Sequence, residues 1–311
     1  MLELHIRIAS RGSALALIQT EEVASVLRRL GHDVSVITIK SIGDVDQSTP
    51  LHTISRRGIF EKEVDRAVLE GKADIAVHSL KDVPLELPNE LEMVAIPMRQ
   101  PPYDAIFPVP LYVLKQNSAV ATGSIRRAAM LKLFRPDLRI LGIRGNVDTR
   151  VKKIQQGYAQ AVVLAEAGLK RLGLKGWKRL NPKFFVPAAG QGALCVTCSS
   201  EAPQELKKAL KKIDHKRTHT EALLERRIAS EIEAGCTSPL GVHAEMVNEK
   251  IIQLTISLVE WSLQSRVFVS LKAPLDKVFE KALNEFEKKG GKSVVKQWRM
   301  KGVPKLFDES A

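Results

Sequence analysis

Apolar residues alternate with polar ones, or recur at helical spacing, along most of the chain. Leu4, Ile6 and Ile8 alternate with polar residues, which is the period of a half-buried strand. Apolar positions from Ala14 to Leu30 then recur every three or four residues, which predicts a helix. Further predicted strands follow at 34–39, 73–77, 91–97, 119–122, 138–143 and 161–164, most of them before a helical pattern. This alternation is typical of an α/β fold.

The last third of the chain has a different pattern. A charged helix is predicted from Lys207 to Ile232, followed by two strands at 251–259 and 266–271 and an amphipathic helix at 275–288. Neighbouring strands without a helix between them indicate antiparallel pairing. We therefore predict a small C-terminal α+β domain with an antiparallel sheet.

Two short segments mark predicted passages between domains. The paired prolines of Gln100-Pro101-Pro102 form a stiff crossover, and the Gly-rich segment 187–194 allows a sharp return of the chain. The predicted domains are 1–97 with 193–212, then 101–187, then 215–311.

Composition narrows the classes of partner. The net charge of the 311 residues is +13, which favours an anionic partner such as nucleic acid, a membrane surface or a polycarboxylate ligand. Only three cysteines occur, so no disulfide framework is expected and a reducing compartment fits. No signal peptide or transmembrane helix is visible, and we predict a cytoplasmic protein. Cys195 and Cys198 lie in an apolar, β-prone run, which predicts buried strand residues rather than a metal or redox site.

Candidate chemistry follows the strand at 73–77. Lys81 and Asp82 stand where this strand should end, and Pro84 prevents a helix from starting at once. In open α/β sheets, ligands bind beyond the carboxyl ends of strands. We therefore predict that Lys81 and Asp82 belong to a ligand site.

Arginines recur near the predicted strand-to-helix junctions. They are Arg11 beside the N-cap candidate Ser13, Arg126 and Arg127 after the N-cap candidate Ser124, Arg144 and Arg150 around a third helix start, and Arg171 on the next helix. Each set alone fits solvated surface arginines beside a capped helix. Their recurrence indicates a multivalent anion site, because guanidinium binds carboxylate in a planar fork.

Seven motifs, in this order, resemble those of the porphobilinogen deaminase (hydroxymethylbilane synthase) family. They are Arg7–Arg11, Ala76–Pro84, Gly123–Arg127, Arg144–Val147, Ala167–Gly173, Pro187–Ala193, and Gly235-Cys236 with Pro239–Gly241. The resemblance implies two α/β domains like those of periplasmic binding proteins, followed by the small C-terminal domain, in a monomer.

The resemblance also implies a function. Four porphobilinogen molecules would be joined head to tail on a dipyrromethane cofactor held by a thioether to Cys236, with loss of ammonia and release of a linear tetrapyrrole for heme and porphyrin biosynthesis. Asp82 would be catalytic. The implied cofactor-binding residues are Ser79, Lys81, Asp82, Thr122, Ser124, Arg126, Arg127, Arg144 and Gln191. The implied substrate-binding residues are Arg11, Ser13, Arg150 and Arg171.

Two segments depart from the family pattern. The loop at 53–57 reads Thr-Ile-Ser-Arg-Arg, where the family usually has glycines and lysine. Residues 121–123 read Ala-Thr-Gly, where the family more often has Gly-Thr-Ser, so one hydroxyl on the cofactor side is missing.

Two other functions compete with this enzyme. A non-catalytic anion-binding protein on the same scaffold would explain the arginines, but not Asp82 together with Cys236. A nucleic-acid-binding protein would explain the basic charge, but aromatics make up only 5% of the chain and no stacking platform is visible.

Overall fold

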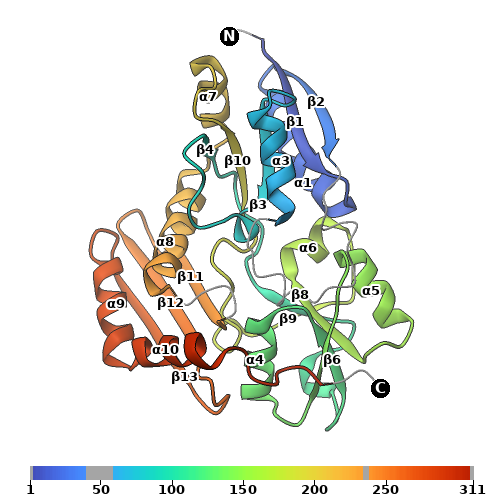
Figure 1. The fold of residues 1–311 in the computed structure, drawn as a ribbon, viewed down its shortest axis with the longest axis vertical. Helices are drawn as coiled ribbons and strands as arrows, with labels where there is room; N and C mark the ends of the chain where they lie inside the picture. Colours follow the sequence, from blue (N-terminus) through green and yellow to red (C-terminus); the bar gives the residue numbers. More distant parts are fainter. Residues whose placement is uncertain (1–2, 40–58, 234–237, 309–311) are drawn as a thin grey trace. The chain divides into compact units, whose positions relative to one another are not determined.

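The computed structural model describes residues 3–39, 59–233 and 238–308, with the side chains of 59–62 left aside (Figure 1). The chain forms two compact units. The first contains the N-terminal part up to Pro101 and the segment Gly192–Thr220, and the second contains Pro102–Gln191 and the chain from Glu221 onward. The predicted domains, 1–97 with 193–212, 101–187 and 215–311, stay a prediction.

The first unit is built on a mixed sheet in the order β2-β1-β3-β10-β4. Its strands are β1 (His5–Arg11), β2 (Asp33–Ile39), β3 (Ile75–Ser79), β4 (Leu91–Ala95) and β10 (Leu194–Ser199). Its helices are α1 (Ala14–Arg29), α3 (Ile59–Leu69), the 3-10 turn η1 (Leu80–Asp82) and α7 (Gln204–Lys211). Strand β1 runs parallel to β2 and β3, whereas β10 runs antiparallel to β3 and β4.

Alternating residues of this sheet form two cores. Ile6 and Ile8 pack with Leu27 of α1 on one face. Ala9 and Ala76 pack with Val64, Val68 and other residues of α3 on the opposite face. Because successive side chains of a strand point to opposite faces, β1 and β3 are buried on both sides. The predicted N-cap is confirmed: Ser13 Oγ accepts a hydrogen bond of 3.3 Å from the N–H of Ala16.

The second unit contains a five-stranded sheet in the order β7-β6-β8-β5-β9. Its strands are β5 (Asp104–Phe107), β6 (Ala119–Thr122), β7 (Arg139–Gly142), β8 (Ala161–Ala165) and β9 (Lys178–Arg179). Its helices are the 3-10 turn η2 (Leu111–Val113), α4 (Ile125–Phe134), α5 (Val147–Gln155) and α6 (Glu166–Arg171). Strands β6, β7 and β8 are parallel, and β5 runs antiparallel to β8 and β9.

The second unit also holds an antiparallel sheet of β11 (Leu240–Met246), β12 (Ile251–Val259) and β13 (Arg266–Pro274). The helices of this part are α8 (Lys216–Ile232), which begins in the first unit, α9 (Val278–Lys288) and α10 (Gly291–Lys301). The predicted antiparallel sheet is confirmed, with β11 and α10 in addition to the predicted elements. One hydrophobic core contains Met130 of α4, Leu254 of β12 and Trp298 of α10. The antiparallel sheet and the sheet of β6–β8 therefore share this core.

The predicted α/β class is therefore confirmed, with a C-terminal α+β part. No helix among the described residues is long and apolar enough to cross a membrane.

Candidate active site

The carboxyl ends of β1 and β3 bring the first set of predicted site residues together. These strands are parallel neighbours, with Ala9 opposite Ala76, so Arg11 and Ser79 stand at the same edge of the sheet. Helix α1 starts at this edge, directly after Ser13. Its Gln19 donates a hydrogen bond of 2.8 Å from Nε2 to Ser79 Oγ. Topology thus gathers residues that lie some 70 positions apart in the sequence.

Asp82 ends the short turn η1 at this edge. The N–H of Leu80 donates to the carbonyl oxygen of Ala193 at 3.0 Å, and the N–H of Val83 donates to Leu80 at 3.3 Å. Leu80 and Val83 are buried, whereas Asp82 is exposed. Val83 is extended, as the following proline predicts. Two apolar anchors therefore hold the turn and leave the carboxylate open to a ligand.

Strands β6 and β7 carry the second set of predicted site residues, in the second unit. They are parallel neighbours, with Thr122 opposite Gly142, so Ser124 and Arg144 follow their strands at one edge. Ser124 caps α4 as predicted, because its Oγ accepts a hydrogen bond of 3.4 Å from the N–H of Arg127. Arg144 is half-buried, and its Nη1 is buried without a hydrogen-bond partner among the described residues.

The surroundings of Arg144 Nη1 bear on whether the site fits an anionic cofactor. A buried N–H of a charged group that lacks an acceptor carries a desolvation cost, and such groups normally have a partner. An acceptor oxygen from a bound carboxylate would remove that cost. The residues present therefore fit a cofactor that carries carboxylates.

Arg126, Arg127 and Gln191 gather around Asp104, a residue that the sequence analysis did not single out. Arg126 donates to both carboxylate oxygens of Asp104, at 2.7 and 3.1 Å, and to the carbonyl oxygen of Val186 at 2.7 Å. Arg127 Nε and Gln191 Nε2 each donate to Asp104 Oδ1, at 2.9 Å. Gln191 Oε1 accepts from Arg127 Nη2 at 3.2 Å. Both guanidiniums thus have an internal partner, and their role in binding the cofactor stays a prediction.

Arg126 and Arg127 both contact the buried carboxylate of Asp104. Burial alone would raise the pKa of Asp104, but the charges of Arg126 and Arg127 outweigh it and hold the pKa well below its usual range. The signal in the sequence was an aspartate that opens an apolar strand, Asp-Ala-Ile-Phe, before a pair of arginines.

The arginines of the next two helices lie differently from the predicted pattern. Arg150, in the second turn of α5, donates from Nε to the carbonyl oxygen of Gly145 at 2.7 Å. Arg171 lies in the last turn of α6, and the first turn carries Glu166 instead. Glu166 is buried and accepts two hydrogen bonds from Arg179, at 2.6 and 2.7 Å. The first turn of α6 therefore carries a paired carboxylate instead of an arginine.

Two predicted features lie outside the described residues: Cys236 and the loop at 53–57. Cys195 and Cys198 are confirmed as buried residues of β10.

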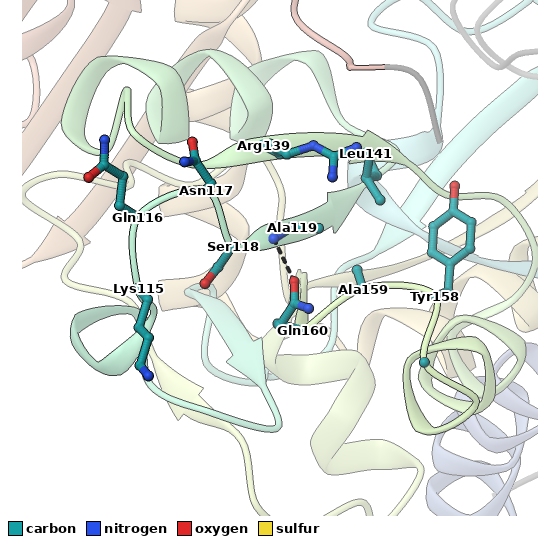
Figure 2. A pocket seen from close by; sticks show the side chains of 11 residues that line it. Lys115, Gln116, Asn117, Ser118, Ala119, Arg139, Leu141, Tyr158, Ala159 and Gln160 are labelled. Carbon is teal, nitrogen blue, oxygen red and sulfur yellow. Dashed lines mark hydrogen bonds between the residues drawn. The ribbon is translucent and has the colours of Figure 1, made fainter. Parts of the chain in front are cut away.

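A hollow of about 640 Å³ lies at the opposite edge of the second unit's mixed sheet. It is lined by residues 115–119 before and at the start of β6, by 157–160 before β8, and by Arg139 and Leu141 of β7 (Figure 2). Gln160 Oε1 accepts a hydrogen bond of 2.6 Å from the N–H of Ala119 there. It contains none of the predicted site residues.

Comparison with known proteins gives the family. A family model described as porphobilinogen deaminase, dipyromethane cofactor binding domain, matches residues 6–208. The chain belongs to the porphobilinogen deaminase family. It is 38% identical over 310 residues to a probable porphobilinogen deaminase of Methanosarcina barkeri, covering 97% of this chain and 94% of that protein. It is 41% identical over 262 residues to one of Methanopyrus kandleri, covering 82% and 88%.

Among solved structures, the periplasmic aliphatic sulphonate binding protein SsuA from Escherichia coli is similar. The TM-score is 0.38 at 14% identity, over 73% of this chain and 70% of that chain. A likeness at this level carries no functional conclusion.

For this member of the porphobilinogen deaminase family, we expect Arg127→Leu to lower the fraction of protein that carries the cofactor. The substitution removes a positive charge and the contacts to Asp104 and Gln191. With one guanidinium fewer, the site should attract an anionic cofactor less strongly. Intact-mass analysis measures the loaded fraction. Arg127→Lys, which keeps the charge without the planar fork, should load to an intermediate level. A fully loaded Arg127→Leu protein would contradict the role of this cluster in anion binding.

Proposed function

We propose that this protein is a hydroxymethylbilane synthase. It joins four porphobilinogen molecules head to tail on a covalently held dipyrromethane, releases ammonia at each step and then releases the linear tetrapyrrole. The observation that carries this proposal is the match to porphobilinogen deaminases along almost the whole chain. An exposed Asp82 on an anchored turn supports it.

The residues that would hold the cofactor are those of the family motifs. Cys236 would form the thioether, while Ser79, Lys81, Thr122 and Ser124 supply hydrogen-bond donors. Arg144 would pair a carboxylate through its buried Nη1, which has no hydrogen-bond partner among the described residues. The cluster of Arg126, Arg127 and Gln191 around Asp104 adds positive charge. When bound, the dipyrromethane supplies the pyrrole carbon to which the first substrate is joined.

Asp82 would act on the pyrrole nitrogens. As ammonia leaves porphobilinogen, positive charge develops on the ring nitrogen. A fixed carboxylate that accepts the N–H hydrogen bond stabilises this charge more in the transition state than in the substrate. The anchors Leu80 and Val83 hold the turn, so little reorganisation is needed when the charge appears. The adjacent Lys81 places a cation where it can pair with a carboxylate of the ligand.

Arg11, Ser13, Arg150 and Arg171 would bind the side chains of the substrate and of the growing chain. Each porphobilinogen carries two carboxylates, so a full chain with the cofactor bears roughly twelve negative charges, two on each of six rings. The net charge of +13 suits such a ligand. We further propose that the enzyme is a cytoplasmic monomer whose partners do not include nucleic acid or membrane. Two buried cysteines in β10 fit a reducing compartment.

The competing function, a non-catalytic anion-binding protein, has less support. It would use the same arginines but has no need for an exposed carboxylate on an anchored turn. Family membership also favours the enzyme.

Intact-mass analysis of Cys236→Ser tests the proposed function. The parent protein should carry the mass of two pyrrole units above its chain mass and release ammonia from porphobilinogen, and Cys236→Ser should lose both. Cys198→Ala is the matched control. Burial raises the pKa of Cys198 to about 11, so this thiol stays protonated near pH 7 and is a poor nucleophile. We expect the control to keep the extra mass. A parent protein without extra mass and without ammonia release would refute the proposal.

A further inference from the structure

Strand β3, which leads to Asp82, ends in two side chains held on opposite faces of the sheet. Ser79 lies on the face covered by α1 and accepts a hydrogen bond from Gln19. His78 lies on the face covered by α3, and its Nε2 is 2.8 Å from Asp65 Oδ1. The strand is thus tied to a helix on each side immediately before the turn that carries Asp82.

The contact between His78 and Asp65 is enclosed. The side chain of His78 is 4% exposed and that of Asp65 is 13% exposed. Thr197 of β10 is fully buried, donates from Oγ1 to Asp65 Oδ1 at 3.2 Å, and lies 3.4 Å from His78 Nε2. Val64 and Val68 of α3 belong to the apolar core on this face of the sheet. A polar contact in such surroundings is stronger than one in water, and it is costly to leave half-made.

Strand β10 connects this contact to the turn. Cys195 stands opposite His78 and Leu194 stands opposite Ser79. The preceding residue, Ala193, accepts the hydrogen bond from the N–H of Leu80 that starts the turn. The direction of β3 relative to β10 at this point therefore sets where the turn begins, and Asp82 ends it.

We infer that Asp65 and His78 are positioning residues for Asp82. This inference rests on the proposed function and assigns the pair a part in it. Asp65 holds the end of β3 through His78 and the adjoining strand through Thr197, so the turn starts from a fixed place. Catalysis by a fixed carboxylate depends on such placement, because a displacement of about 1 Å can cost a hundredfold in rate.

A second His–Asp pair in the same sheet provides a matched control. His5 Nδ1 lies 2.5 Å from Asp33 Oδ2, at the start of β1 and β2. Its side chains are 58% and 64% exposed, and it lies at the edge of the sheet away from Ser79. Exchange of Asp33 for Asn thus removes the same chemical contact without touching the turn.

The test compares Asp65→Asn with Asp33→Asn in the full chain. Hydrogen exchange of the backbone amides of Leu80 and Val83 reports the order of the turn independently of activity. We expect exchange at these amides to become about tenfold faster in Asp65→Asn and to stay unchanged in Asp33→Asn. We also expect kcat for ammonia release to fall about tenfold or more in Asp65→Asn, with KM changed by less than twofold.

Two outcomes in Asp65→Asn would overturn the inference. One is unchanged amide exchange and unchanged kcat. The other is faster amide exchange spread equally over the first unit, which would mark a merely structural contact.

If Asp65→Asn does not fold, Thr197→Val replaces it. This variant removes one hydrogen bond to the same carboxylate and should make exchange at the turn faster as well. Unchanged exchange in Thr197→Val would then overturn the inference.

A parent protein without deaminase activity would instead refute the proposed function. The exchange comparison would still decide whether Asp65 orders the turn.

Discussion

Replacement of Asp82 by Asn should leave a folded protein whose kcat falls by about 10²–10³-fold. The side chain is exposed at the end of an anchored turn, so the substitution leaves the core untouched. Asn can still accept a hydrogen bond from a pyrrole N–H but supplies no negative charge. The carboxylate stabilises the charge-separated transition state more than the bound substrate. The substitution should therefore lower kcat more than it changes KM.

The control for Asp82→Asn is Glu86→Gln. Glu86 is an exposed carboxylate four residues further along the chain, outside η1. It should retain the parent kcat. Steady-state ammonia release gives kcat and KM, and a thermal melt confirms that both variants fold. Near-normal turnover in Asp82→Asn would remove this residue from the mechanism.

Replacement of Asp104 by Asn should lower the free energy of unfolding by about 3–5 kcal/mol. Asp104 is completely buried and is the carboxylate that faces Arg126 and Arg127 in this cluster. Asn has nearly the same size but removes the negative charge that both buried guanidiniums contact. Urea unfolding followed by circular dichroism measures the change.

Asp137→Asn is the control for Asp104→Asn. Arg135 donates to both oxygens of Asp137, at 2.8 and 2.7 Å, but these side chains are 23% and 31% exposed. The same chemical change at this more exposed pair should lower the free energy of unfolding much less than Asp104→Asn does. Equal losses in the two variants would contradict the importance of burial at Asp104.

The contribution of Asp104 to the free energy of unfolding depends on pH, in a direction set by the sign of its pKa shift. The pKa of Asp104 is lower in the folded protein than in the unfolded chain, because the two arginines outweigh the effect of burial. Its contribution is therefore fully present above the unfolded pKa of about 4 and is lost only as the pH falls through the lower folded value. Between pH 5 and pH 8, the difference in the free energy of unfolding between the parent protein and Asp104→Asn should therefore stay constant.

Features that depend on neighbouring residues in the chain could be predicted from the sequence alone. Ser13 and Ser124 cap their helices as expected, because a cap needs only a hydroxyl at one position before a helical run. Val83 is extended because Pro84 follows it. The apolar runs of β1, β3, β6 and β8 identified an α/β fold, since strand periodicity is local.

Shorter or less regular elements escaped prediction. Strand β9 has two residues, too few for a period to show, and β5, with four residues, was not predicted either. Strand β11 begins within the motif Pro239–Gly241, which does not have a strand pattern. Helix α10 follows α9 after a break at Gly290, where φ is 82°. These elements exist because the sheets and the core around Trp298 stabilise them.

The sequence by itself determined the class of fold, the helix starts and the residues that mark the family, because each depends on short stretches of chain. Tertiary structure alone decided which of these residues meet. In the folded chain, Arg126 and Arg127 pair with Asp104. Arg179 pairs with Glu166, and Asp65 of α3 contacts His78. Each of these pairings includes a buried side chain, namely Asp104, Glu166 or His78. Residue spacing carries no record of such pairings, since the partners are chosen by burial and hydrogen-bond geometry after the strands have assembled.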